Sequence, residues 1–128
     1  DHANTRRIEF NLAFTLDRLG GHAEEAEAHY REALLQSELR AGPQSPMAVY
    51  FRLYYARFLD REGRSDAALR LLTPGDGWLG ISTSDPENRA QYLQTLAALR
   101  ARLCPAPTAA SNACQRAEDW LQRPAPTP

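Results

Sequence analysis

The stretch Leu-Asp-Arg-Leu-Gly at residues 16–20 recurs as Leu-Asp-Arg-Glu-Gly at residues 59–63, a shift of 43 residues. The same shift places Ala13 on Ala56, while the first copy carries one extra residue after its glycine. A unit of about 40 residues with glycine near its centre has the length of one helical hairpin. The sequence therefore predicts a chain built from repeated pairs of helices.

A weaker third copy begins at Pro86, which corresponds to Pro46 at a shift of 40 residues. This shift places Ala56 on Leu96. Where the first two copies have a turn glycine, the third has Cys104 and a loop rich in Pro, Ala and Thr. We therefore expect three antiparallel hairpins, at about 5–41, 47–72 and 86–122.

The composition agrees with an all-α fold in a single domain. Of the 128 residues, Ala and Leu supply 38, whereas the β-branched Val and Ile supply three. Unbranched and small apolar residues favour helices, and β-branched residues favour strands. A hydrophobic content of 43% in a chain of this length suffices for one core.

Apolar residues spaced by three or four positions mark the helices, and Ser65 and Asp85 are the expected caps of the fourth and fifth. Pro86 suits the first position of a helix because a backbone N–H is not needed there. The predicted helices cover residues 5–19, 23–41, 47–62, 65–72, 86–103 and 112–122.

Two segments interrupt this pattern. Residues 73–85 contain Pro74, Gly75 and Gly77, which discourage a helix, and residues 123–128 form a Pro-rich tail with no expected folded role. Large apolar residues are usually buried, so packing is the first expectation for the apolar residues in and after the first interruption, and contact with a partner is the alternative for those within it. These residues are Trp78, Leu79, Ile81 and Trp120.

The charge balance argues against a nucleic-acid binder and a membrane-spanning protein. Fifteen basic residues, all Arg, are offset by 16 acidic residues, which gives a net charge of -1. Nucleic-acid binders usually carry a basic excess. No apolar run approaches the roughly 18 residues that span a bilayer, and the pattern of a signal peptide is missing from the start of the sequence.

The two cysteines, Cys104 and Cys114, are separated by nine residues. This spacing fits neither a CxxC redox motif nor a zinc site, because no further thiol and no nearby histidine is present. A disulfide that braces the turn between two helices is the first expectation, and two buried thiols are the alternative. A bridge would favour an extracytoplasmic compartment, whereas free thiols would favour the cytoplasm; the sequence otherwise leaves the location unknown.

The repeat resembles the tetratricopeptide repeat. The first copy matches in its large-small pair Leu12-Ala13 and in a turn glycine, and the second copy repeats the pattern less fully. The matching positions are Leu12, Ala13, Leu16, Gly20 or Gly21, Ala26, Tyr30 and Ala33, followed by Tyr55, Ala56, Leu59, Gly63, Ala68 and Leu72. Units of about 42 residues are similar to the longer variant associated with kinesin light chains. The resemblance implies a short right-handed superhelix of about three hairpins over residues 1–122, and it is better over 1–72 than over 86–122.

The resemblance also implies a concave groove, lined by the first helix of each hairpin, in which a peptide of a partner protein binds. The family's groove positions fall on Arg7, Asn11, Phe14, Asp17, Arg18, Tyr50, Tyr54, Arg57, Asp60, Arg61, Gln94, Ala97 and Arg100. Five arginines against two aspartates favour an acidic segment or a C-terminal carboxylate, because guanidinium pairs with carboxylate through two hydrogen bonds. The alternative is a solvated face in which the Asp-Arg pairs are charges at the helix ends.

No motif for catalysis, metal binding or a cofactor is present. The three histidines, His2, His22 and His29, lie in no HxxxH or HExxH arrangement. No nucleophile is paired with a base in the sequence, so we expect a protein that is not an enzyme and needs no cofactor.

Three functions remain from the sequence. The first is a module for protein or peptide binding. The second is self-assembly, for example as a homodimer, or a scaffold role within a larger bacterial regulatory protein, through the apolar edges near Ile8 or Trp120. An enzyme whose site is shared with another domain is the least favoured, since no residue argues for it.

Overall fold

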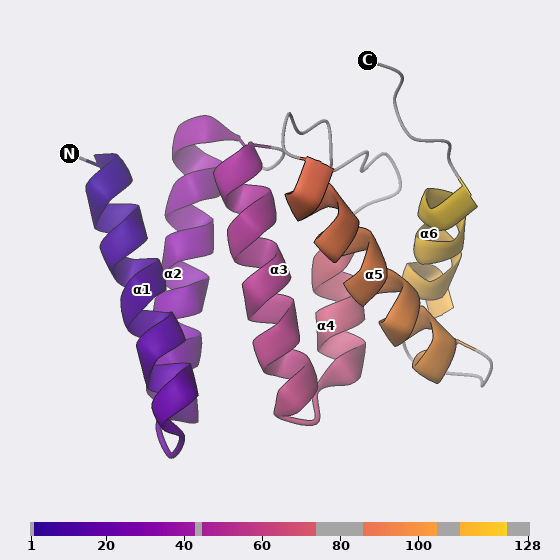
Figure 1. Cartoon of the computed structure of the whole chain (residues 1–128), viewed down its shortest axis with the longest axis horizontal. Helices are drawn as coiled ribbons and strands as arrows, with labels where there is room; N and C mark the ends of the chain where they lie inside the picture. Colours follow the sequence, from indigo (N-terminus) through magenta and orange to yellow (C-terminus); the bar gives the residue numbers. More distant parts are fainter. Residues whose placement is uncertain (1, 43–44, 74–85, 105–110, 123–128) are drawn as a thin grey trace.

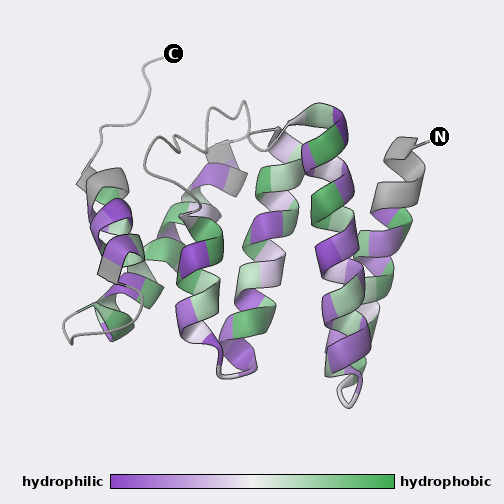
Figure 2. Ribbon diagram, turned by 180° about the vertical axis from the view of Figure 1, so that it is seen from behind, coloured by the Kyte–Doolittle hydropathy of each residue, from purple (hydrophilic) through white to green (hydrophobic). Residues whose placement is uncertain are grey.

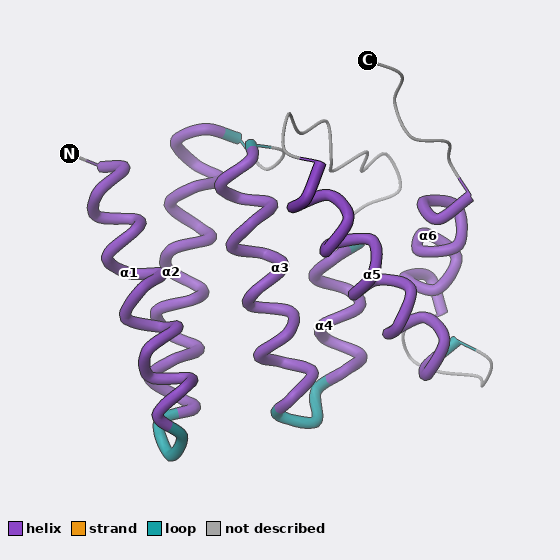
Figure 3. The backbone as a smooth tube through the Cα atoms, in the orientation of Figure 1, coloured by secondary structure: helices purple, strands orange, loops and turns teal. Residues whose placement is uncertain are grey.

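The computed structural model describes residues 2–42, 45–73, 86–104 and 111–122, and it places helices throughout these ranges (Figure 1). The helices are α1 (His2–Leu19), α2 (Ala23–Ala41), α3 (Pro46–Arg61), α4 (Ser65–Leu72), α5 (Pro86–Leu103) and α6 (Ser111–Gln122). No strand occurs in the described residues, as Figure 3 also shows. The all-α prediction is confirmed. The largest difference from the predicted helix bounds is that α1 begins at His2, three residues earlier than expected.

The helices lie in two layers. In Figure 1, α1, α3 and α5 form the near layer, which we call the front layer, and α2, α4 and α6 lie behind them. Figure 2 shows the same arrangement from behind, with hydrophobic and hydrophilic residues alternating along each helix. Each helix packs against the next one in the chain, and α3 also contacts α5. The first hairpin stands at one end of the row and α6 at the other.

Glycine is required where α3 turns into α4. The Gly63 N–H donates to the Asp60 carbonyl at 3.1 Å, and the Arg64 N–H donates to the Leu59 carbonyl at 2.8 Å. This pair of bonds is the Schellman motif, in which the residue after the helix adopts a left-handed conformation. Gly63 has a φ of +80°, a backbone conformation that residues with a Cβ rarely adopt. The recurring glycine of the sequence therefore marks a real structural need.

The starts of α3 and α4 differ in their capping. The Ser45 hydroxyl accepts a hydrogen bond from the Ala48 N–H at 3.2 Å, and Pro46 occupies the first turn. The prediction that Ser65 caps α4 is wrong. Ser65 is the first residue of α4, and its hydroxyl donates to Asp60 Oδ1 at 2.7 Å, since this carboxylate lies within reach at the end of α3.

Several sequence expectations fall outside the described residues. Trp78, Leu79, Ile81 and the expected cap Asp85 lie in the segment 74–85, and the tail 123–128 is likewise outside. Trp120 lies in α6, but its side chain is not among those described.

The core between the first two hairpins is aromatic. The Phe10 and Phe51 rings stack with centroids 4.5 Å apart, and Tyr30 meets Phe10 edge-on at 5.9 Å. Small residues that are fully buried let the helices approach closely. They are Ala13, Ala26, Ala33, Ala48, Ala56 and Ala68. Further along the row the core is mainly Leu, with Tyr92 from α5 and Ala113 and Ala117 from α6.

The C-terminal end of α4 is held by side chains from three other helices. Arg52 of α3 donates to the Leu71 carbonyl at 3.2 Å, and the Tyr92 hydroxyl of α5 donates to the Leu72 carbonyl at 2.6 Å. Arg116 of α6 donates through Nε to the Thr73 carbonyl at 2.7 Å. The last carbonyls of a helix have no partner within it, so these bonds satisfy groups that α4 leaves open.

A disulfide joins Cys104, just after α5, to Cys114 in α6, with the two Cα atoms 5.6 Å apart. The bridge expected from the sequence is therefore present, and no free cysteine remains. It fixes the start of α6 beside the end of α5.

Candidate interaction surface

Three aromatic side chains of the front layer lie together, and we call them the aromatic cluster: Phe14 of α1 and Tyr50 and Tyr54 of α3. The Phe14 and Tyr54 rings meet edge-on at 5.9 Å, and the Tyr50 and Tyr54 centroids are 4.8 Å apart. The buried Phe10 ring contacts all three rings, with distances of 5.4–6.2 Å between ring centroids. Tyr50 remains 39% exposed, so the cluster joins the core to the surface.

Two arginines lie over rings of this cluster. The Arg18 guanidinium carbon is 5.6 Å from the Phe14 ring centroid, and that of Arg57 is 5.4 Å from the Tyr54 centroid. Attraction between a cation and an aromatic face is strongest within about 6 Å of the ring centre. Arg57 Nε also donates to Thr95 Oγ1 of α5 at 3.4 Å. The front layer thus holds cations beside aromatic rings that are half-buried, with the exposed Tyr50 next to them.

Asp17 is occupied by groups of this chain. Its carboxylate accepts a hydrogen bond from the Tyr30 hydroxyl at 3.0 Å and forms an ion pair with Arg61 of α3. Burial and the neighbouring Asp17 carboxylate raise the pKa of Tyr30. The Asp17 side chain is only 9% exposed. Asp17 and Arg61 therefore link α1 to α3.

Asp60 has the same role one unit later. It accepts hydrogen bonds from Ser65 at 2.7 Å and from Arg102 of α5 at 2.8 Å. Burial alone would raise the pKa of Asp60, but these bonds outweigh burial and lower it. Asp17, Asp60 and Arg61 thus pair across helices, and they do not form the adjacent Asp-Arg pairs of a solvated face.

The remaining predicted groove residues lie on two of the front helices, α1 and α5. Arg7 and Asn11 are exposed on α1, and Gln94 and Ala97 are exposed on α5. Arg100 lies toward α6, with its guanidinium 4.0 Å from the Glu118 carboxylate. The structure thus brings together the predicted residues Phe14, Arg18, Tyr50, Tyr54 and Arg57.

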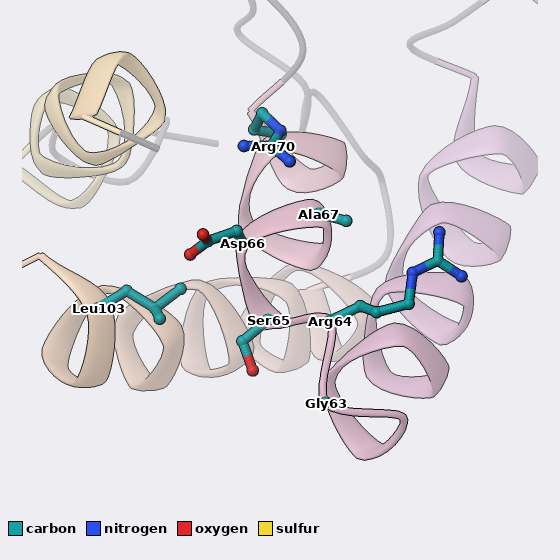
Figure 4. A pocket seen from close by; sticks show the side chains of 7 residues that line it. All are labelled: Gly63, Arg64, Ser65, Asp66, Ala67, Arg70 and Leu103. Atoms are coloured by element: carbon teal, nitrogen blue, oxygen red, sulfur yellow. The ribbon is translucent and has the colours of Figure 1, made fainter. Parts of the chain in front are cut away.

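A hollow that the sequence did not indicate lies at α4 (Figure 4). Its volume is about 550 Å³, and a second hollow of about 410 Å³ shares Arg64, Ala67 and Arg70 with it. The first hollow is lined by Gly63, Arg64, Ser65, Asp66, Ala67, Arg70 and Leu103. The sequence signal for this hollow is a spacing of three residues on one side of a short helix, as in Arg64, Ala67 and Arg70. None of the predicted groove residues lines either hollow.

Arg64 is already engaged by Glu27. Its guanidinium donates to Glu27 at 2.7 Å, and the same carboxylate accepts a hydrogen bond from the Tyr55 hydroxyl at 2.8 Å. Burial raises the pKa of Glu27, but the bonds from Arg64 and Tyr55 outweigh it and leave the pKa lowered. This network ties α2 to α3 and to the start of α4, so it is structural.

The titratable residues offer no metal centre within the described ranges. No group of three or more His, Cys, Asp and Glu side chains that could hold an ion is found among those residues. His29 pairs with Glu9 of α1 at 2.6 Å, and His22 lies 3.4 Å from Glu25. Over the same part of the chain, no helix is both long and apolar enough to cross a membrane.

Comparison with family models, curated proteins and solved structures finds no match to this chain. The surface itself is therefore the basis for a proposal. Its distinguishing features are the partly exposed aromatic cluster and the two arginines over its rings.

Proposed function

We propose that this chain is a protein-interaction module of the tetratricopeptide type, which binds a peptide segment of a partner across its front layer without catalysing a reaction. The observation that carries the proposal is the aromatic cluster with Arg18 and Arg57 over its rings. Arg and Tyr are the residue types that most often anchor protein interfaces.

The tetratricopeptide part of the proposal is supported by the positions of small residues and glycines. Ala13, Ala26, Ala33 and Ala56 occupy the small positions of the family pattern, and all four have no exposed surface. Gly63 occupies the turn position with a left-handed conformation. Superhelical stacking of the three hairpins is part of the same proposal.

The charges of the front layer favour an acidic ligand. The two aspartates of the predicted set are occupied by Arg61 and Arg102, which leaves Arg18 and Arg57 as the cations over the aromatic rings and Arg7 as a further exposed cation on α1. Guanidinium groups bind carboxylates through paired hydrogen bonds, and aromatic rings accept apolar side chains. We therefore expect a peptide with an apolar side chain beside an acidic residue or a free C-terminal carboxylate.

The test is a selection from a random peptide library on the immobilised chain, followed by affinity measurements on the selected peptides. The variant Arg18→Glu/Arg57→Glu reverses both charges over the rings. The control Arg40→Glu/Arg70→Glu makes the same change in charge on α2 and α4 of the other layer. We expect acidic or free-carboxylate peptides that the first variant loses by tenfold or more and the control retains.

Two results would reject the proposal. One is a failure to enrich any peptide family, and the other is a set of peptides that binds both variants equally well. Amidation of the C-terminus of each selected peptide separates recognition of an internal acidic residue from recognition of the terminal carboxylate.

A further inference from the structure

Exposed apolar side chains are concentrated on the first hairpin. In the described part of the chain, five of the six large hydrophobic side chains that are exposed lie on α1 and α2, and the sixth is Tyr50. On α1 these are Ile8, Leu12 and Leu19, which are 66%, 42% and 69% exposed. Large exposed apolar patches commonly mark interaction sites.

The three α1 residues form one stripe. At 3.6 residues per turn, Ile8, Leu12, Thr15 and Leu19 fall within an arc of about 60° on the helix, and we call these four residues the α1 stripe. Phe10 points in nearly the opposite direction, toward Phe51 and Tyr54 of α3. Because the stripe lies opposite Phe10 and its three apolar residues are exposed, it faces away from α3, and Figure 1 shows α1 as the end helix of the front layer.

The internal repeat shows what such a stripe packs against. At the shift of 43 residues, Ile8 corresponds to Phe51 and Leu12 to Tyr55. Phe51 is 3% exposed and stacks on Phe10, and Tyr55 is 8% exposed and stacks on Tyr30 at 5.8 Å. In the second unit, the residues at these positions therefore pack against the first hairpin. Ile8 and Leu12 of the α1 stripe occupy the same positions in the first unit, but they remain exposed.

We propose that the α1 stripe binds the α1 stripe of a second copy of this chain, in a symmetric dimer. Apart from the stripe, the exposed large hydrophobic residues of the described surface are Leu35 and Leu39 on α2 and Tyr50 in the aromatic cluster. Within the described surface, the stripe is thus the longest apolar row that a second copy offers for contact. Twofold symmetry, with the same patch on both subunits, is the commonest arrangement of soluble dimers.

Side-chain size and helix dipoles define an antiparallel register. In this register Ile8 meets the partner subunit's Leu19, and Leu12 meets the partner subunit's Thr15. The small Thr15 leaves room for Leu12, so the two helices can approach closely at their centre. Antiparallel packing also brings opposite ends of the helix dipoles together. No residue of the aromatic cluster takes part, so the dimer and the peptide site can be tested separately.

The first test is the mass of the chain in solution as a function of concentration, by sedimentation or light scattering. We expect a dimer that the variant Leu12→Glu/Leu19→Glu converts to a monomer with unchanged helical content. The matched control Leu35→Glu/Leu39→Glu introduces the same charges at exposed leucines of α2 and should remain dimeric. A wild-type chain that stays monomeric up to millimolar concentration overturns the proposal, as does a dimer that only the control disrupts.

The second test is cross-linking through introduced cysteines. The native cysteines do not interfere, because Cys104 and Cys114 are bonded to each other. Each variant carries one introduced cysteine, so neither variant gains a second free thiol within its own chain. A mixture of Ile8→Cys and Leu19→Cys chains should form a disulfide-linked pair under mild oxidant, and each variant alone should not. Efficient cross-linking of each variant to itself, and not in the mixture, would overturn the antiparallel register.

Discussion

Glu27 lies in a network with three other side chains. It accepts hydrogen bonds from Tyr55 and Arg64 and lies 3.4 Å from the Arg31 guanidinium. Its side chain is 15% exposed, so solvent screens these contacts only in part. One carboxylate therefore links α2, α3 and the turn before α4.

We predict that Glu27→Gln lowers the free energy of unfolding by about 1–2 kcal/mol at pH 7, because hydrogen bonds to a charged group are stronger than those to a neutral one. The pKa of Glu27 is below its ordinary value of 4.5. The stabilisation is therefore fully present above pH 4.5 and is lost as the pH falls through the folded pKa. Urea unfolding at pH 7 and at pH 3 should show the difference between wild type and variant shrink at the lower pH.

The control for this prediction is Glu24→Gln, an exposed residue at the start of the same helix. Its effect should stay within about 0.5 kcal/mol at both pH values. Equal losses for the two variants at pH 7 would show that the Glu27 network does not stabilise the fold.

At the residue scale, the sequence did not predict how the charges of the front layer pair. The repeat placed Asp17, Arg18, Asp60 and Arg61 correctly near the helix ends. Adjacent residues on a helix point in different directions, so Asp17 pairs with Arg61 of the next unit rather than with Arg18. Pairing across helices depends on their spacing and rotation, which the sequence alone does not contain.

At the scale of single elements, α4 is the most dependent on its surroundings. It has eight residues, fewer than an isolated helix needs to be stable in water. Leu69 and Leu72 bury one side of it, and donors from α3, α5 and α6 hold its C-terminal carbonyls. Its stability therefore comes from tertiary contacts.

We predict that Tyr92→Phe lowers the free energy of unfolding by about 1 kcal/mol, because the Leu72 carbonyl loses its buried hydroxyl donor. Hydrogen exchange of the amides of α4 should accelerate more than that of α2. The partly exposed Tyr50→Phe is the control and should leave α4 unchanged. Equal exchange of α4 in both variants would contradict the role of Tyr92.

We predict that Cys104→Ser/Cys114→Ser lowers the free energy of unfolding by about 2–3 kcal/mol, the scale for a loop of this length. Exchange of the α6 amides should accelerate first, since the disulfide ties α6 to the end of α5. Wild-type protein under a reductant should show the same pattern. An unchanged α6 in both samples would mean that packing of Ala113 and Ala117 holds this helix without the bridge.

The helices themselves were the most predictable part of the fold. Spacing of apolar residues, the turn glycines and Pro46 and Pro86 gave all six within a few residues. The errors lie at helix starts: no residue before Thr5 breaks a helix, so α1 extends to His2, and Ser65 turns to Asp60 because that carboxylate is within reach. Local sequence does not show which tertiary partner competes for a capping side chain.

At the scale of the whole molecule, aromatic side chains form the contact through which the first hairpin and the second stabilise each other. Phe10 contacts Phe51 and Tyr54 of α3 and Tyr30 of α2, so it belongs to both hairpins. In repeat proteins, stability is approximately the sum of unit terms and contacts between neighbours. A substitution at Phe10 therefore tests whether destabilising the first hairpin also destabilises the hairpins that follow it.

We predict that Phe10→Ala lowers the free energy of unfolding by about 3–5 kcal/mol, the usual cost of deleting a buried phenylalanine. Circular dichroism reports all helices, whereas fluorescence reports Trp78 and Trp120 in the C-terminal half of the sequence. We expect both transitions to shift together, since α3 connects the two halves. A fluorescence transition that stays in place would show that the hairpins unfold independently.

The end of α4 also bears on how such an array could gain units by gene duplication. Tyr92 and Arg116 reach back to carbonyls of the preceding unit, so an extra hairpin inserted before α5 would remove two fitted donors from a buried helix end. A unit added before α1 would meet the exposed Ile8 and Leu12, and among the described residues it would break no such bond. Lengthening by duplication is therefore easier at the N-terminal side of the row than between its second and third hairpins.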